Sequence, residues 1–304
     1  MRHKRRPRRE IQRQRRIITI SLFIVLLCFS FGYAAFSTNI NLSAKGNIKE
    51  KPISISTITR NTVTSGDGLY KDAYTENKYI YKGKEPNNYL KFSNELWRII
   101  SINSDNTLKI IKENHIGSFY YNEQSDNNDW SLSSLNTYLN NEYINSLSEK
   151  TKIVSGTFYN GYIEKLSIDK SLTEVIKLEK SSSWGGNIGL LSFSEYMTAS
   201  SNEDCKTYFD ARPNNHVCYL NNYLHDTSFW GGIWLLNGFT SPANGVYIIW
   251  NVEEDTANVH YSVSYGQANK INYSNGIMYV KPVLFVKTDN KLYGLGTKTN
   301  PYHL

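Results

Sequence analysis

The sequence predicts an α+β fold, made of mixed short-strand sheets and hairpins with one or two helices, after a single N-terminal transmembrane helix or signal segment. Three observations predict it: a charge-free apolar stretch near the N-terminus, short β-branched runs between turn residues, and two stretches whose apolar residues recur every three or four positions. We expect four parts, which are a basic cytoplasmic tail (1–16), the apolar segment (17–36), a stalk or linker (37–76) and an extracytoplasmic domain (77–304).

The positive charge of the chain belongs to its first residues. Residues 1–16 hold nine of the 34 Lys and Arg residues and one of the 27 Asp and Glu residues, which leaves 25 basic and 26 acidic residues for the remainder. The net charge of +7 therefore describes the tail. Since a nucleic-acid site needs its basic residues on the folded face that binds, we expect no nucleic-acid partner.

The apolar segment explains the expected location. Ile17–Phe36 contains 20 residues without a charge, and 20 helical residues span about 30 Å, the thickness of a bilayer core. The positive-inside rule keeps the basic tail in the cytoplasm and places everything after Phe36 outside. The prediction is a single-pass protein of the cell membrane, with its N-terminus cytoplasmic and its C-terminal domain extracellular.

A second outcome for this segment stays open. A basic start, an apolar middle and small residues at the end also describe a cleavable signal peptide, for which Ala34 and Ala35 are the candidate cleavage residues. The string Gly32–Gly46 resembles the export signals of biofilm-matrix fibre proteins. A retained anchor is favoured by a small margin, and cleavage would make the protein secreted.

The domain opens with strand signals. Tyr79–Lys82 and Tyr89–Phe92 are typical of short strands, and Leu96–Ile102 with Thr107–Glu113 predicts a hairpin around a turn-forming tetrapeptide. Near the C-terminus, Ile277–Val280 and Val283–Lys287 predict a last strand pair in which Pro282 marks a bulge or a sheet edge. Further apolar runs, each typical of a strand, are Ile188–Phe193, Ile233–Leu236, Val246–Val252 and Asn258–Val263.

Two stretches have helical periodicity. In Asp129–Ser148 the apolar residues recur every three or four positions, with Asp129 or Ser131 as the expected N-cap. A second, weaker helix is predicted in Ser171–Lys180. The residues expected on the buried face of the first helix are Leu132, Leu135, Leu139, Tyr143 and Leu147.

The cysteines and histidines indicate no catalytic or metal site. Cys205 and Cys218 lie on the exported side, where a disulfide persists; closing their 14-residue loop contributes about 3 kcal/mol, and free thiols are the alternative. The spacing of His216, Cys218 and His225 does not match a structural zinc site. His225 with Asp226 resembles a base and its orienting group, but no nucleophile motif accompanies them. We expect no enzyme activity and no metal.

The aromatic residues give the binding candidates. Aromatic side chains on glycine-rich loops stack on sugar rings or anchor a partner, whereas most buried Trp residues are core. The acidic turn Glu253–Asp255, with Asn237 and Asn251, would supply oxygen ligands for calcium, although acidic turns are usually solvated, so no cofactor is expected. The ligand-binding candidates are Trp184, Trp230, Trp234, Trp250, Glu253 and Asp255.

Several phrases resemble an uncharacterised domain of exported proteins from low-GC Gram-positive bacteria, over about residues 77–304. Lys281 stands where that family has Arg. More distantly, Trp, Ser-Pro, an acidic turn and a closing strand resemble C-type-lectin-like and formylglycine-enzyme-like domains, which implies an architecture and no chemistry. The phrases are Tyr81–Ile102, Leu135–Leu147, Ile188–Tyr196, Trp234–Pro242, Val280–Lys287 and Gly296–Leu304.

Three functions follow, in order of preference. The first is a membrane-anchored or secreted extracytoplasmic domain that binds a glycan or a protein at the bacterial cell surface without catalysis. The second is a structural or biofilm-matrix protein released by signal cleavage. The third is an envelope enzyme of unknown type. The sequence leaves the identity of the ligand and the oligomeric state open.

Overall fold

The computed structural model describes residues 12–13, 15–26, 50–123, 128–163, 171–202, 221–226, 228, 231–239, 245–251, 263–267 and 278–304, and for 239, 245, 247–251 and 263–267 it describes the backbone alone. The chain divides into two compact units, Met1–Lys49 and Glu50–Leu304. The second unit contains both helices and mostly antiparallel sheets, which confirms the predicted α+β class.

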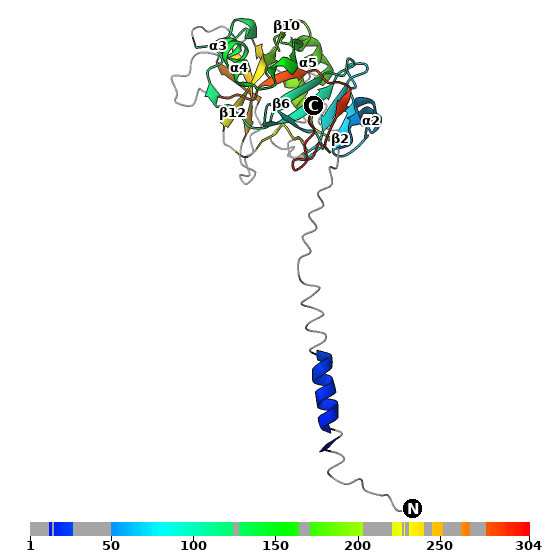
Figure 1. Ribbon diagram of the computed structural model, residues 1–304. Coiled ribbons are helices and arrows are strands. Elements are labelled where there is room, and N and C mark those ends of the chain that lie inside the picture. Colours follow the sequence, from blue (N-terminus) through cyan, green and yellow to red (C-terminus); the bar gives the residue numbers. More distant parts are fainter. Residues whose placement is uncertain are drawn as a thin grey trace, which may run out of the picture. The chain divides into compact units, whose positions relative to one another are not determined.

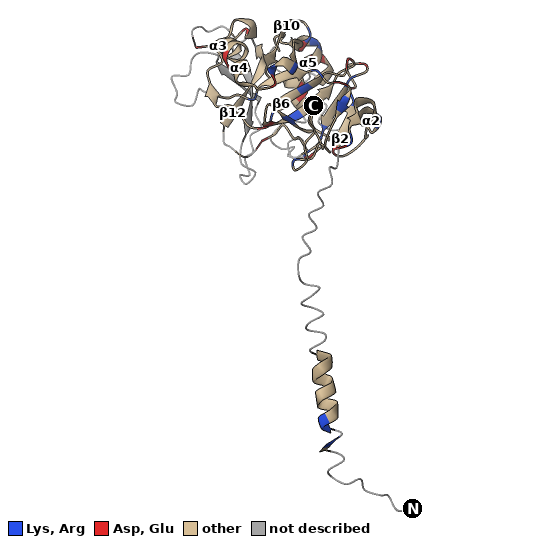
Figure 2. Cartoon of the chain, viewed as in Figure 1, with Lys and Arg blue, Asp and Glu red and all other residues tan. Residues whose placement is uncertain are grey.

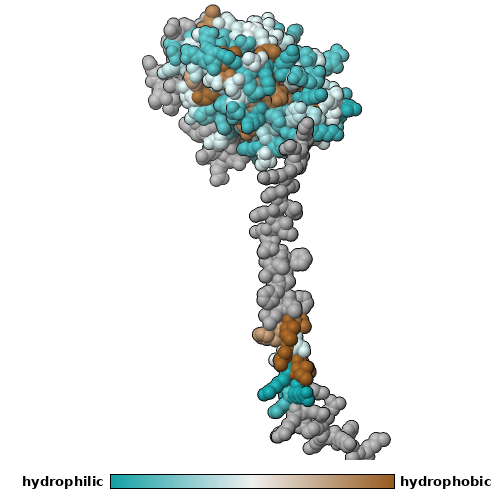
Figure 3. All heavy atoms as spheres, in the orientation of Figure 1, coloured by the Kyte–Doolittle hydropathy of each residue, from teal (hydrophilic) through white to brown (hydrophobic). Residues whose placement is uncertain are grey.

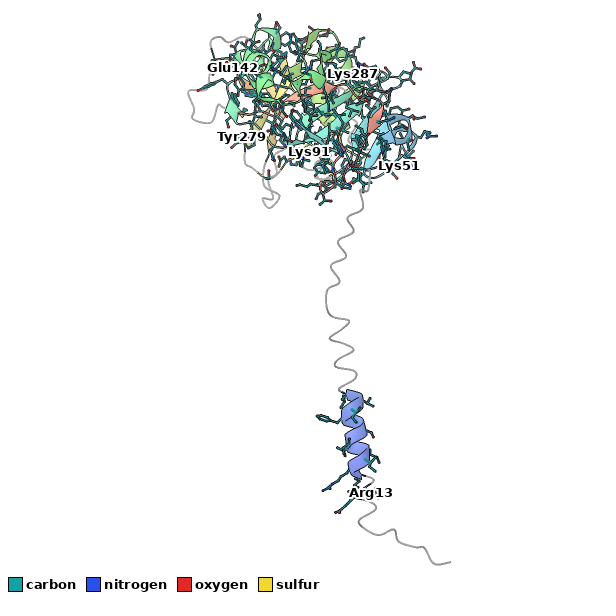
Figure 4. All side chains as sticks on the ribbon, in the orientation of Figure 1. Arg13, Lys51, Lys91, Glu142, Tyr279 and Lys287 are labelled. Atoms are coloured by element: carbon teal, nitrogen blue, oxygen red, sulfur yellow. The ribbon has the colours of Figure 1, made fainter. Side chains whose placement is uncertain are left out.

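The first unit contains a helical segment over residues 15–26, preceded by Arg13 (Figure 4). Its basic residues lie at the N-terminal end, and the rest of the helix is uncharged (Figure 2). Its apolar side chains are exposed, Phe23 by 66% (Figure 3). No helix in the described part of the chain has the length and apolarity to cross a membrane.

The predicted stalk (37–76) is wrong for residues 50–76, which are part of the folded unit. Strand β1 (Ile53–Ser54) pairs with β17 (Lys291–Leu292), and Ser54 caps helix α2 (Ile55–Arg60). Ile55 and Ile58 of this helix are buried, and strand β2 (Gly68–Lys71) joins the main sheet beside β3. The isoleucines spaced along this stretch therefore lie in a core, because a short capped helix brings them to one face.

The larger sheet has eight strands in the order β11-β16-β6-β5-β3-β2, with β4 beside β5 and β8 beside β16. Figure 1 labels β2 and β6 of this sheet. The predicted hairpin is present: β5 pairs with β6 across the turn, where Asn106 has a positive φ. The predicted strands β3 and β4 are also present. The bounds are β3 Tyr79–Lys82, β4 Tyr89–Phe92, β5 Glu95–Ile102, β6 Leu108–Lys112, β8 Ile153–Val154, β11 Ile188–Gly189 and β16 Val283–Val286.

The second sheet has five strands in the order β14-β13-β12-β15-β7. Both strands of the predicted last pair are present, as β15 and β16, but they do not pair with each other. Tyr279 of β15 pairs in parallel with β12, whereas β16 pairs with β6. Pro282 lies where the chain passes from one sheet to the other, and its carbonyl oxygen accepts from the Lys112 amide at 3.0 Å. Pro fits there because it has no N–H to leave unpaired. The bounds are β7 Ser118–Phe119, β12 Gly231–Phe239, β13 Gly245–Asn251, β14 Val263–Gln267 and β15 Met278–Tyr279.

The first predicted helix is present in four short pieces. Asp129 caps a 3-10 turn, and Ser133 caps helix α3. Of the five expected core residues four are buried, but Leu132 is 65% exposed, because the tighter first turn rotates it away from the apolar face. The pieces are η1 Trp130–Leu132, α3 Ser134–Tyr138, the π-helical η2 Leu139–Tyr143 and α4 Ile144–Ser146, followed by the 3-10 turn η3 Lys150–Lys152.

Two further helices lie against the main sheet. Helix α5 (Leu172–Glu179) confirms the second predicted helix and begins at Ser171, whose side chain and Glu174 form a capping box. The apolar run Ile188–Phe193 does not continue as a strand: β11 ends at Gly189, and helix α6 (Phe193–Thr198) starts after a second capping box. Strands β9 (Gly156–Tyr159) and β10 (Ser183–Gly186) form a small antiparallel sheet, and α5 lies between them in the chain (Figure 1).

Candidate functional site

A cleft with a volume of about 460 Å³ opens on the face of the eight-stranded sheet where α5, α6 and β9 approach it. Its floor comes from β3, β5, β6 and β16, and its rim from the loops 72–78 and 103–107. Polar and charged side chains line it together with Tyr74, Tyr81, Tyr159 and Tyr223. The charged residues are Asp72, Glu76, Lys78, Asp105, Lys109, Glu179, Lys180 and Glu195.

Lys109 lies at the floor of this cleft. It extends from β6, where its backbone pairs with Phe285 of β16, and its side chain is 8% exposed. The ammonium donates to Glu195 Oε1 at 2.5 Å and lies 5.0 Å from the ring centre of Phe158 and 5.3 Å from that of Phe285. Burial lowers the pKa of Lys109, and the carboxylate of Glu195 opposes that shift. The result is a charged group held on aromatic faces.

The two carboxylate oxygens of Glu195 accept hydrogen bonds from two different groups. It is the third residue of the α6 capping box, in which its Oε2 accepts from the Ser192 amide at 3.1 Å. Its other oxygen accepts from Lys109. Burial works to raise the pKa of Glu195, but Lys109 and Lys78 together hold it below its ordinary value. The group is therefore an ionised carboxylate at neutral pH.

Glu179, the last residue of α5, is the second carboxyl group at the floor and is 2% exposed. Its Oε1 accepts from the Ser194 amide at 2.8 Å, and its Oε2 contacts the Ser194 and Ser192 hydroxyl groups. Burial raises the pKa of Glu179 to about 7, although the hydrogen bonds from Ser194 work in the opposite direction. The pKa values of two carboxyl groups in one cleft thus shift in opposite directions, because one has a lysine partner and the other has hydroxyl and amide partners.

The aromatic residues form a buried chain of ring contacts that leads to the cleft floor. Trp234 is 1% exposed, and its indole N–H donates to the Phe119 carbonyl at 2.8 Å. Trp184 is half-buried in β10. Trp234 therefore packs in the core, whereas Trp184 packs against the core and keeps part of its surface exposed. The successive centroid distances are 5.6 Å for Trp234–Tyr121, 5.8 Å for Tyr121–Trp130, 5.9 Å for Trp130–Trp184, 5.6 Å for Trp184–Phe158 and 5.2 Å for Phe158–Phe285.

Most other candidates lie outside the described residues. For Trp250 the backbone is in β13, and nothing is described of its side chain. The remaining candidates outside the described residues are Ala34, Ala35, Cys205, His216, Cys218, Trp230, Glu253 and Asp255.

The polar groups singled out with them have backbone and ion-pair partners. The Asn237 side chain accepts from the Phe193 amide and donates to the Tyr159 and Gly161 carbonyls, so its oxygen is engaged in the core. Within the described ranges, no group of three or more His, Cys, Asp or Glu residues has the geometry of a metal site.

His225 and Asp226 each contact another side chain. His225 Nδ1 lies 3.1 Å from the Tyr196 hydroxyl, and burial lowers the pKa of His225 to about 4. Asp226 Oδ2 accepts from Lys281 Nζ at 2.7 Å. Lys281, which stands where the resembling family has Arg, thus makes an ion pair at the turn between the sheets. Nearby, the centre of the His115 ring lies 4.2 Å from that of Tyr279.

The sequence reasoning missed the cleft residues. A signal for one of them was present: Ser192-Phe-Ser-Glu195 has the spacing of a capping box, which predicts a helix start. Nothing local indicates that Glu195 meets Lys109, 86 residues away in the chain.

The comparison with known families gives one match. Residues 105–288 match the family described as Domain of unknown function (DUF6273), which includes β6, α5 and α6 and therefore the three charged residues of the cleft floor. No curated protein and no solved structure matches the chain.

Proposed function

The chain belongs to the DUF6273 family, and on that premise we propose that it is an extracytoplasmic domain that binds a small polar ligand or the exposed end of a larger partner at the bacterial cell surface, without catalysis. The cleft over the eight-stranded sheet is its binding site. The observation that carries the proposal is the floor of this cleft, where buried charged groups converge beneath an opening. Burying charges costs free energy, and ionisable groups whose pKa values are shifted within a cleft are candidates for a functional site.

The dimensions of the cleft support a small ligand. Its volume of about 460 Å³ lies within the range of about 300–1,000 Å³ found for small-molecule sites. Polar groups at the floor orient a ligand, while tyrosine rings supply contact area on the walls. Protein partners usually bind flatter surfaces, so a protein would insert one side chain or a terminus here.

The N-terminal part supports the location. Nine basic residues precede the charge-free stretch Ile17–Phe36, and that order is typical of a segment that leaves its basic flank in the cytoplasm. The proposal therefore includes a single-pass anchor at 17–36, with release by cleavage near Ala34 or Ala35 as its variant. The likeness to C-type-lectin-like domains agrees with a binding role and stays a prediction.

Cosedimentation with cell-wall material tests the proposal. The full chain, purified in a polyoxyethylene detergent, is mixed with purified peptidoglycan sacculi that retain their wall polymers, and the bound fraction is measured. Thr157, exposed on β9, lines the cleft. Thr157→Trp fills the opening without entering the core, and we expect it to weaken sedimentation at least tenfold.

Ser118→Trp is the matched control, because Ser118 is exposed on β7 and does not line the cleft. We expect this variant to bind like the wild type. The proposal fails if the wild-type chain does not sediment, or if Thr157→Trp sediments as well as Ser118→Trp. Fibres that form without any binding would instead support the structural or matrix alternative.

A further inference from the structure

The hydrogen-bonding capacity of the cleft floor exceeds what the protein uses. An ammonium has three donors, and a carboxylate has about four acceptor positions. Within the part of the chain that the structure describes, Lys109 Nζ has Glu195 Oε1 as its acceptor, and Glu195 adds the Ser192 amide as a second donor. Donors and acceptors thus remain side by side at the bottom of an open cleft, where water or a ligand must satisfy them.

The Lys109–Glu195 pair itself favours an uncharged group beside it, within a cleft that is lined by five acidic and three basic residues. The charges of Lys109 and Glu195 neutralise each other, and at the rim Lys78 Nζ lies 3.6 Å from Asp72 Oδ2. An anionic group beside Lys109 would also face Glu195, and a cationic group beside Glu195 would also face Lys109. A hydroxyl group avoids this conflict, because it both donates and accepts. Two adjacent hydroxyl groups match the pair, one accepting from Lys109 and the other donating to Glu195.

The walls suit the rest of such a ligand. Tyr159 is 42% exposed on β9 and lines the cleft, and Lys180 Nζ lies 5.7 Å from the centre of its ring. Tyr74 also lines the cleft, and its neighbour Thr75 accepts from Lys180 Nζ at 3.5 Å, so the loop 72–78 reaches the same side of the cleft as Tyr159. An aromatic ring offers a flat apolar face to the C–H groups of a sugar while leaving its hydroxyl groups free for the floor.

We propose that the cleft takes a neutral sugar ring with adjacent hydroxyl groups, and that Lys109 and Glu195 together hold these two hydroxyl groups. This inference rests on the proposed function, since it names the ligand class of the same cleft. Lys109 and Glu195 are then the residues that determine specificity, and Tyr159 is the stacking wall. Sugars with a charged group at the paired hydroxyl positions, and charged dipeptides, bind more weakly.

Titration of the full chain with defined sugars tests this. Methyl glycosides of glucose, galactose and mannose are titrated by saturation-transfer NMR in a polyoxyethylene detergent, which carries no sugar itself. We expect at least one glycoside to bind, and its deoxy analogue at either paired hydroxyl position to bind at least tenfold more weakly. Glucosamine and an alanyl-lysine dipeptide are the charged probes, and we expect them to bind at least fivefold more weakly than that glycoside.

A matched pair of double variants tests the two residues. Lys109→Met with Glu195→Gln removes the cleft pair without leaving a lone buried charge, and we expect glycoside affinity to fall at least thirtyfold. Lys112→Met with Glu95→Gln is the control, since Lys112 is also a buried lysine of β6, with an ion pair of 3.0 Å to Glu95, but does not line the cleft. We expect the control variant to bind like the wild type.

Each outcome decides the inference. It is overturned if alanyl-lysine or glucosamine binds best, if deoxygenation leaves glycoside affinity unchanged, or if both double variants bind equally well. Should the cleft variant not fold, the deoxy series on the wild-type chain still decides. If Thr157→Trp abolishes cosedimentation with sacculi while no glycoside binds or competes, the proposed function stands and the sugar inference falls. Absence of cosedimentation removes the proposed function itself.

Discussion

The cleft floor and the aromatic core lie next to each other, but one buries charged or ionisable groups and the other buries aromatic rings. In the core, Trp234, Tyr121 and Trp130 bury large rings against one another, and the indole N–H of Trp234 has a backbone acceptor. At the floor, Lys109, Glu195 and Glu179 bury charged or ionisable groups below an opening. Phe158 joins the two regions, since it contacts Trp184 on one side and the Lys109 ammonium on the other.

The difference teaches where function is to be sought in this chain. Aromatic abundance predicts stacking sites, but Trp234 is fully buried in the core, and Trp184 is partly buried against it. Burying the polar residues of the floor costs free energy, and an apolar core would not need a lysine or a second carboxyl group. Variants in the two regions are therefore expected to behave differently, and the following experiments test that contrast.

The largest effect is expected in the core. Trp234→Ala removes a fully buried ring and one hydrogen bond, and we expect it to lower the free energy of unfolding by about 3–5 kcal/mol. Urea unfolding followed by circular dichroism measures this. The control is Leu132→Ala, at a residue that is 65% exposed, for which we expect a change within about 0.5 kcal/mol. A loss below about 1 kcal/mol for Trp234→Ala would contradict its place in the core.

The next effect concerns the ion pair of the floor. Lys109→Met alone leaves the Glu195 carboxylate buried without its partner, which costs about 3 kcal/mol. Adding Glu195→Gln removes the lone charge, so the double variant should recover most of that loss. The same urea experiment compares the two variants. Equal stabilities of single and double variants would show that the two groups are not coupled.

The pH dependence of stability tests Glu179. Its folded-state pKa of about 7 exceeds its ordinary value of 4.5, so its contribution is present below pH 4.5 and is lost as pH rises through 7. The loss is on the order of 3 kcal/mol. Glu179→Gln has no such loss, and its stability relative to the wild type should rise by that order between pH 4.5 and 8. A constant difference across this range would disprove the assignment.

His225 acts in the opposite direction, which makes it a useful control. Burial lowers its pKa to about 4 from an ordinary 6.5, so its contribution is present above pH 6.5 and is lost as pH falls through 4. The two groups partly cancel in the wild type between pH 4.5 and 6.5. His225→Gln should therefore expose the slope of Glu179, with stability falling as pH rises. The groups facing Glu179, namely Lys109 and Glu195, are unchanged in both variants.

The smallest effect on stability is expected at the cleft wall. Tyr159 is 42% exposed, so Tyr159→Ala should change the free energy of unfolding by no more than about 0.5 kcal/mol. Glycoside affinity should nevertheless fall about five- to tenfold, because the stacking face is lost. Saturation-transfer NMR on the variant measures this. Unchanged affinity would mean that the ligand does not use this wall.

Local patterns predicted the elements well where one period dominates. The hairpin of β5 and β6 and the helix α5 follow directly from alternation and from three-to-four-residue spacing. The stalk over 50–76 and the strand pair around Pro282 were placed incorrectly, because both depend on partners far away in the chain. Ile55 and Ile58 are buried only since β1 pairs with β17, more than 230 residues later.

The candidate site is formed by residues that lie far apart in the sequence. Glu195 was predictable as a helix-capping residue, and Lys109 as one residue of a strand. Their meeting was not, because each lies in a segment whose local pattern is satisfied without the other. The same holds for Glu179, whose spacing along α5 gives no sign of the Ser194 amide it contacts.

By itself the sequence determined the separation of a basic tail and an apolar segment from a nearly neutral domain, the α+β class and the positions of β3, β4, the β5–β6 hairpin and α5, because charge distribution and hydrophobic period act over a few residues. Tertiary structure alone decided which aromatic rings are core and which polar groups share a cleft. Burial and pairing of that kind arise when β6, α5 and α6 pack together, and packing is a property of distant segments in contact.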